Sequence, residues 1–137
     1  MANLNIQEVD TRDHDQAISQ LESIIEMVEA LQDAQDSDND EAYDEARQTI
    51  EEDPLSVEVR SSWYTPGCQD NTPDEYRILL CTGGPAVQIV GDLDEYGQPE
   101  SAKIQYQDWF KPWTDYPMDS EQEEAVVEYA RCFYFGE

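Results

Sequence analysis

The stretch that decides the fold is residues 15–45, DQAISQLESIIEMVEALQDAQDSDNDEAYDE. Acidic residues recur in it at alternating intervals of four and three, which places side chains on one face of an α-helix; they are Glu22, Glu26, Glu29, Asp33, Asp36 and Asp40. Apolar residues follow the same rhythm about 140° around the helix; they are Ala17, Leu21, Ile24, Val28 and Leu31. The stretch therefore predicts a helix with one buried face and one acidic face.

A second helix is predicted from about Asn39 to Glu52, because Pro54 cannot continue it. Its apolar residues share one face, and they are Ala42, Tyr43, Ala46 and Ile50. Further acids, Asp44 and Glu45 among them, occupy the other face. We therefore expect residues 13–52 to form an antiparallel helical hairpin with an anionic outer surface.

The connection between these helices has acids at several positions of a calcium-binding loop that would begin at Asp36. However, Glu41 stands where such a loop requires glycine, and Arg47 stands where it requires glutamate. The sequence therefore predicts a helix–helix turn without a metal, and no motif for another cofactor is present.

The pattern changes after Pro54. Alternating apolar and polar residues, separated by Gly-, Pro- and Asn-containing turns, predict a four-stranded antiparallel sheet within residues 55–109. The expected strands are 55–63, 76–81, 86–90 and 101–109. A Pro-broken aromatic loop, 109–118, leads to a closing helix over 120–134. Capping boxes are predicted at the three helix starts, namely Asp13 with Gln16, Asp38 with Glu41, and Ser120 with Glu123.

These elements define an α+β fold in one domain, residues 1–137, a length suited to a single core. The aromatic residues argue against disorder. Five of them stand in or beside the predicted strands and the aromatic loop, and we expect them in the core: Trp63, Tyr64, Trp109, Phe110 and Trp113.

Charge is the unusual property of the chain. There are 33 acidic and 7 basic residues, a formal net charge of −26. Residues 1–53 hold 17 of the acids and only 2 of the basic residues. Such a chain repels nucleic acids and anionic membranes, so the sequence predicts a partner with a basic surface.

The sequence lacks the residues that several classes of function require. The only histidine, His14, stands among acids at the start of the first helix, with no nucleophile nearby in sequence, so we expect no enzyme activity. The three cysteines show no C-x-x-C spacing, which is typical of a reducing cytoplasm and of neither zinc sites nor disulfide frameworks. The N-terminus has no signal-peptide pattern, and no apolar run approaches the ~20 residues of a membrane helix.

The acidic hairpin, the small size and the absence of catalytic motifs resemble the DNA-mimic anti-defence proteins of phages and mobile elements, the anti-CRISPR and anti-restriction class. The resemblance implies an inhibitor that acts in the cytoplasm of a bacterial cell and occupies the basic nucleic-acid-binding groove of a CRISPR or restriction complex. It implies that the partner is bound by eight acids: Glu22, Glu26, Glu29, Asp33, Asp36, Asp40, Asp44 and Glu45.

Three alternatives stay open at this stage. The sheet and the aromatic loop could form a protein-interaction module, with acid serving solubility and steering. The acids could be an ordinary solvated face. The apolar column of the first helix could instead be a coiled-coil seam between copies, since the sequence is compatible with a monomer or a homodimer.

Overall fold

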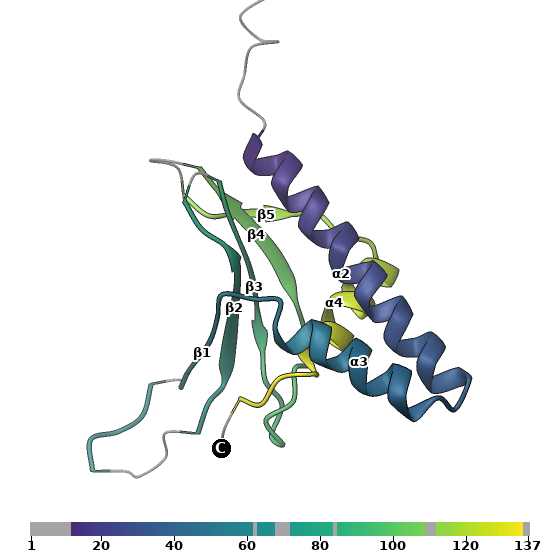
Figure 1. Ribbon diagram of the computed structural model, residues 1–137. Coiled ribbons are helices and arrows are strands. Elements are labelled where there is room, and N and C mark those ends of the chain that lie inside the picture. Colours follow the sequence, from purple (N-terminus) through teal and green to yellow (C-terminus); the bar gives the residue numbers. More distant parts are fainter. Residues whose placement is uncertain (1–11, 62, 68–71, 84, 109–111, 136–137) are drawn as a thin grey trace, which may run out of the picture.

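The computed structural model describes residues 12–61, 63–67, 72–83, 85–108 and 112–135 (Figure 1). Their helices and strands, in chain order, are α2 (Arg12–Asp36), α3 (Asp40–Glu51), β1 (Ser56–Arg60), β2 (Glu75–Cys81), β3 (Ala86–Asp92), β4 (Lys103–Gln107), β5 (Thr114–Tyr116) and α4 (Ser120–Ala130). The predicted α+β class is confirmed. The sheet has five strands in the described residues, where four were expected.

The sheet is an antiparallel meander in the order β1-β2-β3-β4-β5. Its register aligns Ile78, Ile89 and Ile104 across β2, β3 and β4, and all three are buried. The helices lie on this face, and α2 contacts α3, α4, β3 and β4 (Figure 1). No described helix covers the opposite face of the sheet, which we call the open face (Figure 1).

The extra strand, β5, lies inside the segment predicted as an aromatic loop. It pairs with β4 in a register that sets Asp115 opposite Gln105. Its three residues stand between Pro112 and Pro117, which makes the strand too short to show a period-two pattern. The strand exists because β4 offers a free edge, and this is a tertiary cause that local sequence does not contain.

The buried faces of the helices agree with the prediction. The apolar column of α2 is 0–4% exposed; its members are Ala17, Leu21, Ile24, Val28 and Leu31. Ile50 of α3 is buried, as are Val126, Tyr129 and Ala130 of α4. All of them belong to one core cluster that includes the inner face of the sheet. The column of α2 is therefore used inside the protein and is not available as a seam between copies.

The turn between α2 and α3 differs from the prediction by one residue. Asp38 has a left-handed backbone with φ of 55°, and Asn39 N–H donates to the Ala34 carbonyl at 3.2 Å. This arrangement ends α2 in the way that a glycine commonly does. The N-cap of α3 is therefore Asn39, whose side chain accepts from Ala42 N–H at 3.1 Å, and not Asp38.

The other two predicted caps are also displaced. Asp13 lies inside α2, so it is not the residue before the helix. The cap of α4 is Asp119, which exchanges hydrogen bonds with Gln122, in place of the predicted Ser120 and Glu123. Adjacent residues of similar capping ability occupy these starts, and the path of the incoming chain selects between them.

The first strand is shorter than predicted. β1 ends at Arg60, and Trp63 is fully exposed, with Tyr64 exposed beside it. The prediction that these two aromatic residues are core is therefore wrong. Trp113 is half-buried, whereas Trp109 and Phe110 lie outside the described residues. The reason is that the strand ends at Arg60, three residues before Trp63, so the alternation that was expected to turn Trp63 inward does not reach it.

Candidate acidic interface on the helical hairpin

The eight acids predicted to bind a partner are all exposed in the structure. Five lie on α2 and three on α3, and the two helices pack against each other across a short turn. We refer to the eight as the acidic hairpin surface: Glu22, Glu26, Glu29, Asp33, Asp36, Asp40, Asp44 and Glu45. The structure therefore places every predicted site residue on one helical hairpin.

The dimensions of this surface are comparable to a short stretch of duplex DNA. Asp36 follows Glu22 by 14 residues, which corresponds to about 21 Å at about 1.5 Å per residue. One DNA strand advances about 3.4 Å per phosphate, so the same length covers about six phosphate intervals. The five carboxylates of α2 are slightly sparser than that, and α3 supplies three more alongside.

No residue of the acidic hairpin surface forms an ion pair with another described side chain. The one basic residue of α3, Arg47, is partly exposed and is bonded to neighbouring groups of the fold. It donates to Glu51 at 3.1 Å, to the Tyr43 hydroxyl at 3.4 Å and to the Cys132 carbonyl at 3.3 Å. The hydrogen bond with Tyr43, followed by that with Glu51, raises the pKa of Arg47. Its charge is therefore used within the fold and does not neutralise the outer acids.

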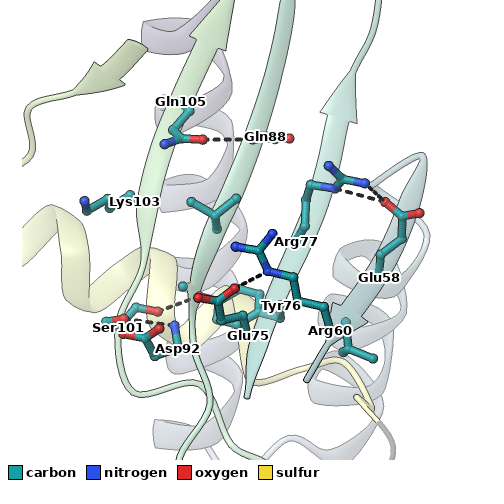
Figure 2. A pocket seen from close by; sticks show the side chains of 13 residues that line it. Glu58, Arg60, Glu75, Tyr76, Arg77, Gln88, Asp92, Ser101, Lys103 and Gln105 are labelled. Carbon is teal, nitrogen blue, oxygen red and sulfur yellow. Dashed lines mark hydrogen bonds and ion pairs between the residues drawn. The ribbon is translucent and has the colours of Figure 1, made fainter. Parts of the chain in front are cut away.

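Other basic residues lie on the open face of the sheet, where each is paired (Figure 2). Arg77 binds Glu58, and Arg60 binds Glu75. The pairs join neighbouring strands, because Glu58 stands opposite Arg77 in the β1–β2 register and Arg60 opposite Glu75. Arg60 and Arg77 are thus each balanced by an acid on the open face, whereas the acidic hairpin surface has no ion-pair partner among the described side chains.

A third pair extends this network along the sheet. Lys103 Nζ lies 3.5 Å from Asp115 Oδ2, and Gln105 donates to Asp115 Oδ1 at 2.9 Å. The hydrogen bond from Gln105, followed by the charge of Lys103, lowers the pKa of Asp115. Gln88, which is buried, donates in turn to Gln105 at 2.8 Å. The side chains of β3, β4 and β5 are therefore linked across the open face.

This face contains a shallow depression of about 480 Å³ (Figure 2). Its charged walls are the Arg77–Glu58 and Arg60–Glu75 pairs, with Val90 and Lys103 at the centre of the sheet. Because the charges of the two arginines are already matched, the depression offers little net charge to a ligand.

A second hollow, of about 810 Å³, is lined by residues of α2 and α4. Glu29 lines one side, and Glu121, Glu124 and Glu128 line the other. Arg131 also borders it, and its guanidinium donates to the Pro99 carbonyl at 3.2 Å. The acids of α4 were not among the predicted site residues, because acids in a first helical turn have a local explanation. Their shared hollow with Glu29 extends the acidic region onto α4.

The described residues contain no evident reaction centre. His14 packs against the rings of Tyr106 and Tyr116, with centroid distances of 5.6 and 5.4 Å. Burial raises the pKa of the Cys81 and Cys132 thiols, which lowers their reactivity at neutral pH. No cluster of three or more metal-binding side chains occurs in the part of the chain that the structure describes. None of the described helices is both long and apolar enough to span a membrane.

Comparisons of the chain with protein-family models, with curated proteins and with solved structures found no match. The candidate site consequently stands on the distribution of charge and on the geometry of the hairpin.

Proposed function

We propose that this protein is a DNA-mimic inhibitor without catalytic activity. It would occupy the basic nucleic-acid-binding groove of a bacterial defence complex in the cytoplasm and block target DNA binding, with a CRISPR complex as the first candidate and a restriction enzyme as the next. The observation that supports this proposal is the acidic hairpin surface, with eight exposed carboxylates and no ion-pair partner among the described side chains.

Rigidity favours such a role. α2 is fixed to the core by five side chains that are 0–4% exposed, and α3 is fixed by Ile50. The carboxylates are therefore carried on backbone that is already ordered, and binding loses less conformational entropy than it would for a flexible acidic tail. Lysine and arginine side chains of the target groove would contact these carboxylates in place of phosphates, with fast, salt-sensitive association.

The separation of charge favours a specific surface over a general excess of acid. An acidic protein that needed only solubility could distribute its few cations anywhere. Here Arg60, Arg77 and Lys103 lie on the open face of the sheet, and Arg47 is paired with Glu51. None of these four cations pairs with a residue of the acidic hairpin surface.

The proposal is tested by two triple variants of equal charge. The first neutralises Glu22, Glu26 and Glu29 of α2 by glutamine. The second, a matched control, neutralises three exposed acids near the β3–β4 turn. Its substitutions are Asp92→Asn, Glu95→Gln and Glu100→Gln. Each triple reduces the net negative charge by three, so any difference between them reflects position.

Each protein is immobilised as bait in a bacterial lysate and eluted with a salt gradient, with duplex DNA as competitor. We expect the unmodified chain to retain a nucleic-acid-binding complex that duplex DNA displaces. The α2 triple should release it at clearly lower salt, and the control triple should behave like the unmodified chain. Equal effects of the two triples would show that only total charge matters and would contradict the proposal.

A second candidate function is a protein-interaction module, favoured by the open sheet face and its depression. In that case the captured partner would stay bound at high salt and would not be displaced by duplex DNA. Trp113→Ala would weaken its capture more than the α2 triple. Trp113 is half-buried and borders another hollow, of about 490 Å³, that includes Gln88 and Gln107 at one end of that face.

A further inference from the structure

The outer edge of β1 carries free backbone hydrogen-bonding groups. β1 is the first strand of the sheet and pairs only with β2 among the described strands. The Arg60 carbonyl points toward β2, because it accepts from Asp74 N–H at 2.9 Å. Successive residues of a strand direct their backbone groups to opposite sides, so the N–H and C=O of Val59 point to the free edge. Such an edge is a template for another strand.

The same edge exposes apolar side chains. Val59 is 42% exposed, Leu55 is 60% exposed and Trp63 is fully exposed. Val59 and Val57 stand opposite Tyr76 and Ile78 in the β1–β2 register, so they belong to the face of the sheet that carries the helices. Val57 and Val59 therefore share the face that carries the helices, and Val59, on the outermost strand, stays exposed there.

We propose that β1 pairs with β1 of a second copy of this chain, antiparallel, with the two-fold axis at Val59. This register sets Val59 opposite Val59, Glu58 opposite Arg60, and Val57 opposite Ser61. One register thus places the exposed Val59 side chains of the two copies together and sets each charge of β1 opposite its complement.

Charge complementarity is what selects this register over its neighbour. A two-fold axis at Glu58 would set two glutamates opposite each other, and directly opposed like charges destabilise a strand pair. With the axis at Val59, Glu58 and Arg60 alternate across the new junction, next to the Arg77–Glu58 and Arg60–Glu75 pairs already present. The charge ladder of the open face would then run without interruption from one copy into the other.

The location suits a chain with a net charge of −26. β1 lies at the side of the sheet away from α2, whose acids would otherwise repel the partner (Figure 1). A two-fold axis perpendicular to the sheet keeps both helical layers on the same side, so the dimer would display two acidic hairpin surfaces in one direction. The inference stands on the edge itself and does not require the proposed function.

The test is the oligomeric state of the full chain by sedimentation equilibrium. High salt should strengthen this dimer, because at 1 M salt the Debye length is about 3 Å and the repulsion between the two acidic chains is screened. Binding of a basic partner through the acidic hairpin surface should instead weaken as salt rises. We expect Val59→Lys to reduce the association constant by about tenfold or more, since it opposes two lysines at the axis. The matched control is Thr114→Lys, which adds the same charge to the opposite edge strand, β5, and should leave association unchanged.

A cross-link tests the register. In a hydrogen-bonded antiparallel pair the opposed Cα atoms are about 5.5 Å apart, within the range of about 4.4–6.8 Å that a disulfide accepts. Val59→Cys should therefore form a covalent dimer under mild oxidation, more than Thr114→Cys or the unmodified chain with its own three cysteines. A chain that is monomeric at high salt, or a Val59→Cys variant that cross-links no more than Thr114→Cys, would overturn the inference. If the capture experiment found no partner that duplex DNA displaces, the proposed function would fail, but the inferred β1 dimer would not be affected.

Discussion

Gly91 is the position where a single methyl group should damage this fold most clearly. A Cβ atom added to Gly91 would lie 2.1 Å from the Ser101 carbonyl oxygen, 2.7 Å from Tyr76 Cε1 and 2.8 Å from the Tyr76 hydroxyl. Gly91 stands opposite Tyr76 in the β2–β3 register, and the Tyr76 ring is 2% exposed. The nearest atom belongs to backbone, so it cannot give way by a side-chain rotation. Gly91→Ala must therefore shift the chain or expel the ring.

The cost has two parts. Overpacking a well-filled core costs about 1–3 kcal/mol. The Tyr76 hydroxyl donates to the Ser101 carbonyl at 2.7 Å, and loss of that hydrogen bond adds about 0.5–1.5 kcal/mol. We therefore expect Gly91→Ala to lower the free energy of unfolding by about 1.5–4.5 kcal/mol.

Urea unfolding, followed by circular dichroism, measures this loss as a shift of the transition midpoint. The control is the same substitution in a Tyr76→Ala background, where the ring contacts are absent and only the Ser101 contact remains. The cost of Gly91→Ala should be smaller there. A loss of less than about 1 kcal/mol in the unmodified chain, a small effect for a core substitution, would refute the reasoning, as would a loss that does not depend on Tyr76.

Other predictions concern two buried tyrosines and the turn between α2 and α3. Tyr129, fully buried on α4, donates to exposed Asp53 at 2.6 Å, so Tyr129→Phe should cost about 1–2 kcal/mol in urea unfolding, whereas Tyr134→Phe at an exposed position should cost less than about 0.5 kcal/mol. Burial raises the pKa of Tyr76 and Tyr129 above the ordinary 10.0; the stabilisation linked to their neutral form is present below pH 10 and is lost as pH rises above it. In an alkaline titration these two phenols should ionise only as circular dichroism reports unfolding. A phenolate signal that differs, while the fold is intact, between the unmodified chain and Tyr76→Phe or Tyr129→Phe would contradict this. Asp38→Gly should stabilise the chain by about 0.5–1 kcal/mol, because glycine adopts a φ of 55° without steric cost; destabilisation would show that the Asp38 side chain has a role of its own.

The sequence by itself determined the helices, their buried faces and the exposure of the acids. The intervals that place Leu21, Ile24 and Val28 on one face also place Glu22, Glu26 and Glu29 on another, because both follow from the period of a single helix. Such a pattern is local, and it holds in any fold that buries the apolar face. For the same reason the strand of Glu75–Cys81 was expected almost to the residue.

Tertiary structure alone decided the features that depend on neighbours. β5 exists because the edge of β4 is available, and Trp63 is exposed because β1 ends at Arg60, before the alternation reaches it. The N-caps of α3 and α4 moved by one residue because the path of the chain, such as the left-handed Asp38, selects among adjacent capping residues. The pairing of Arg60 and Arg77 with acids on the open face likewise depends on strand register. The asymmetry between a balanced sheet and an unbalanced hairpin is therefore a property of the folded chain, because it arises from pairs of residues that are distant in sequence.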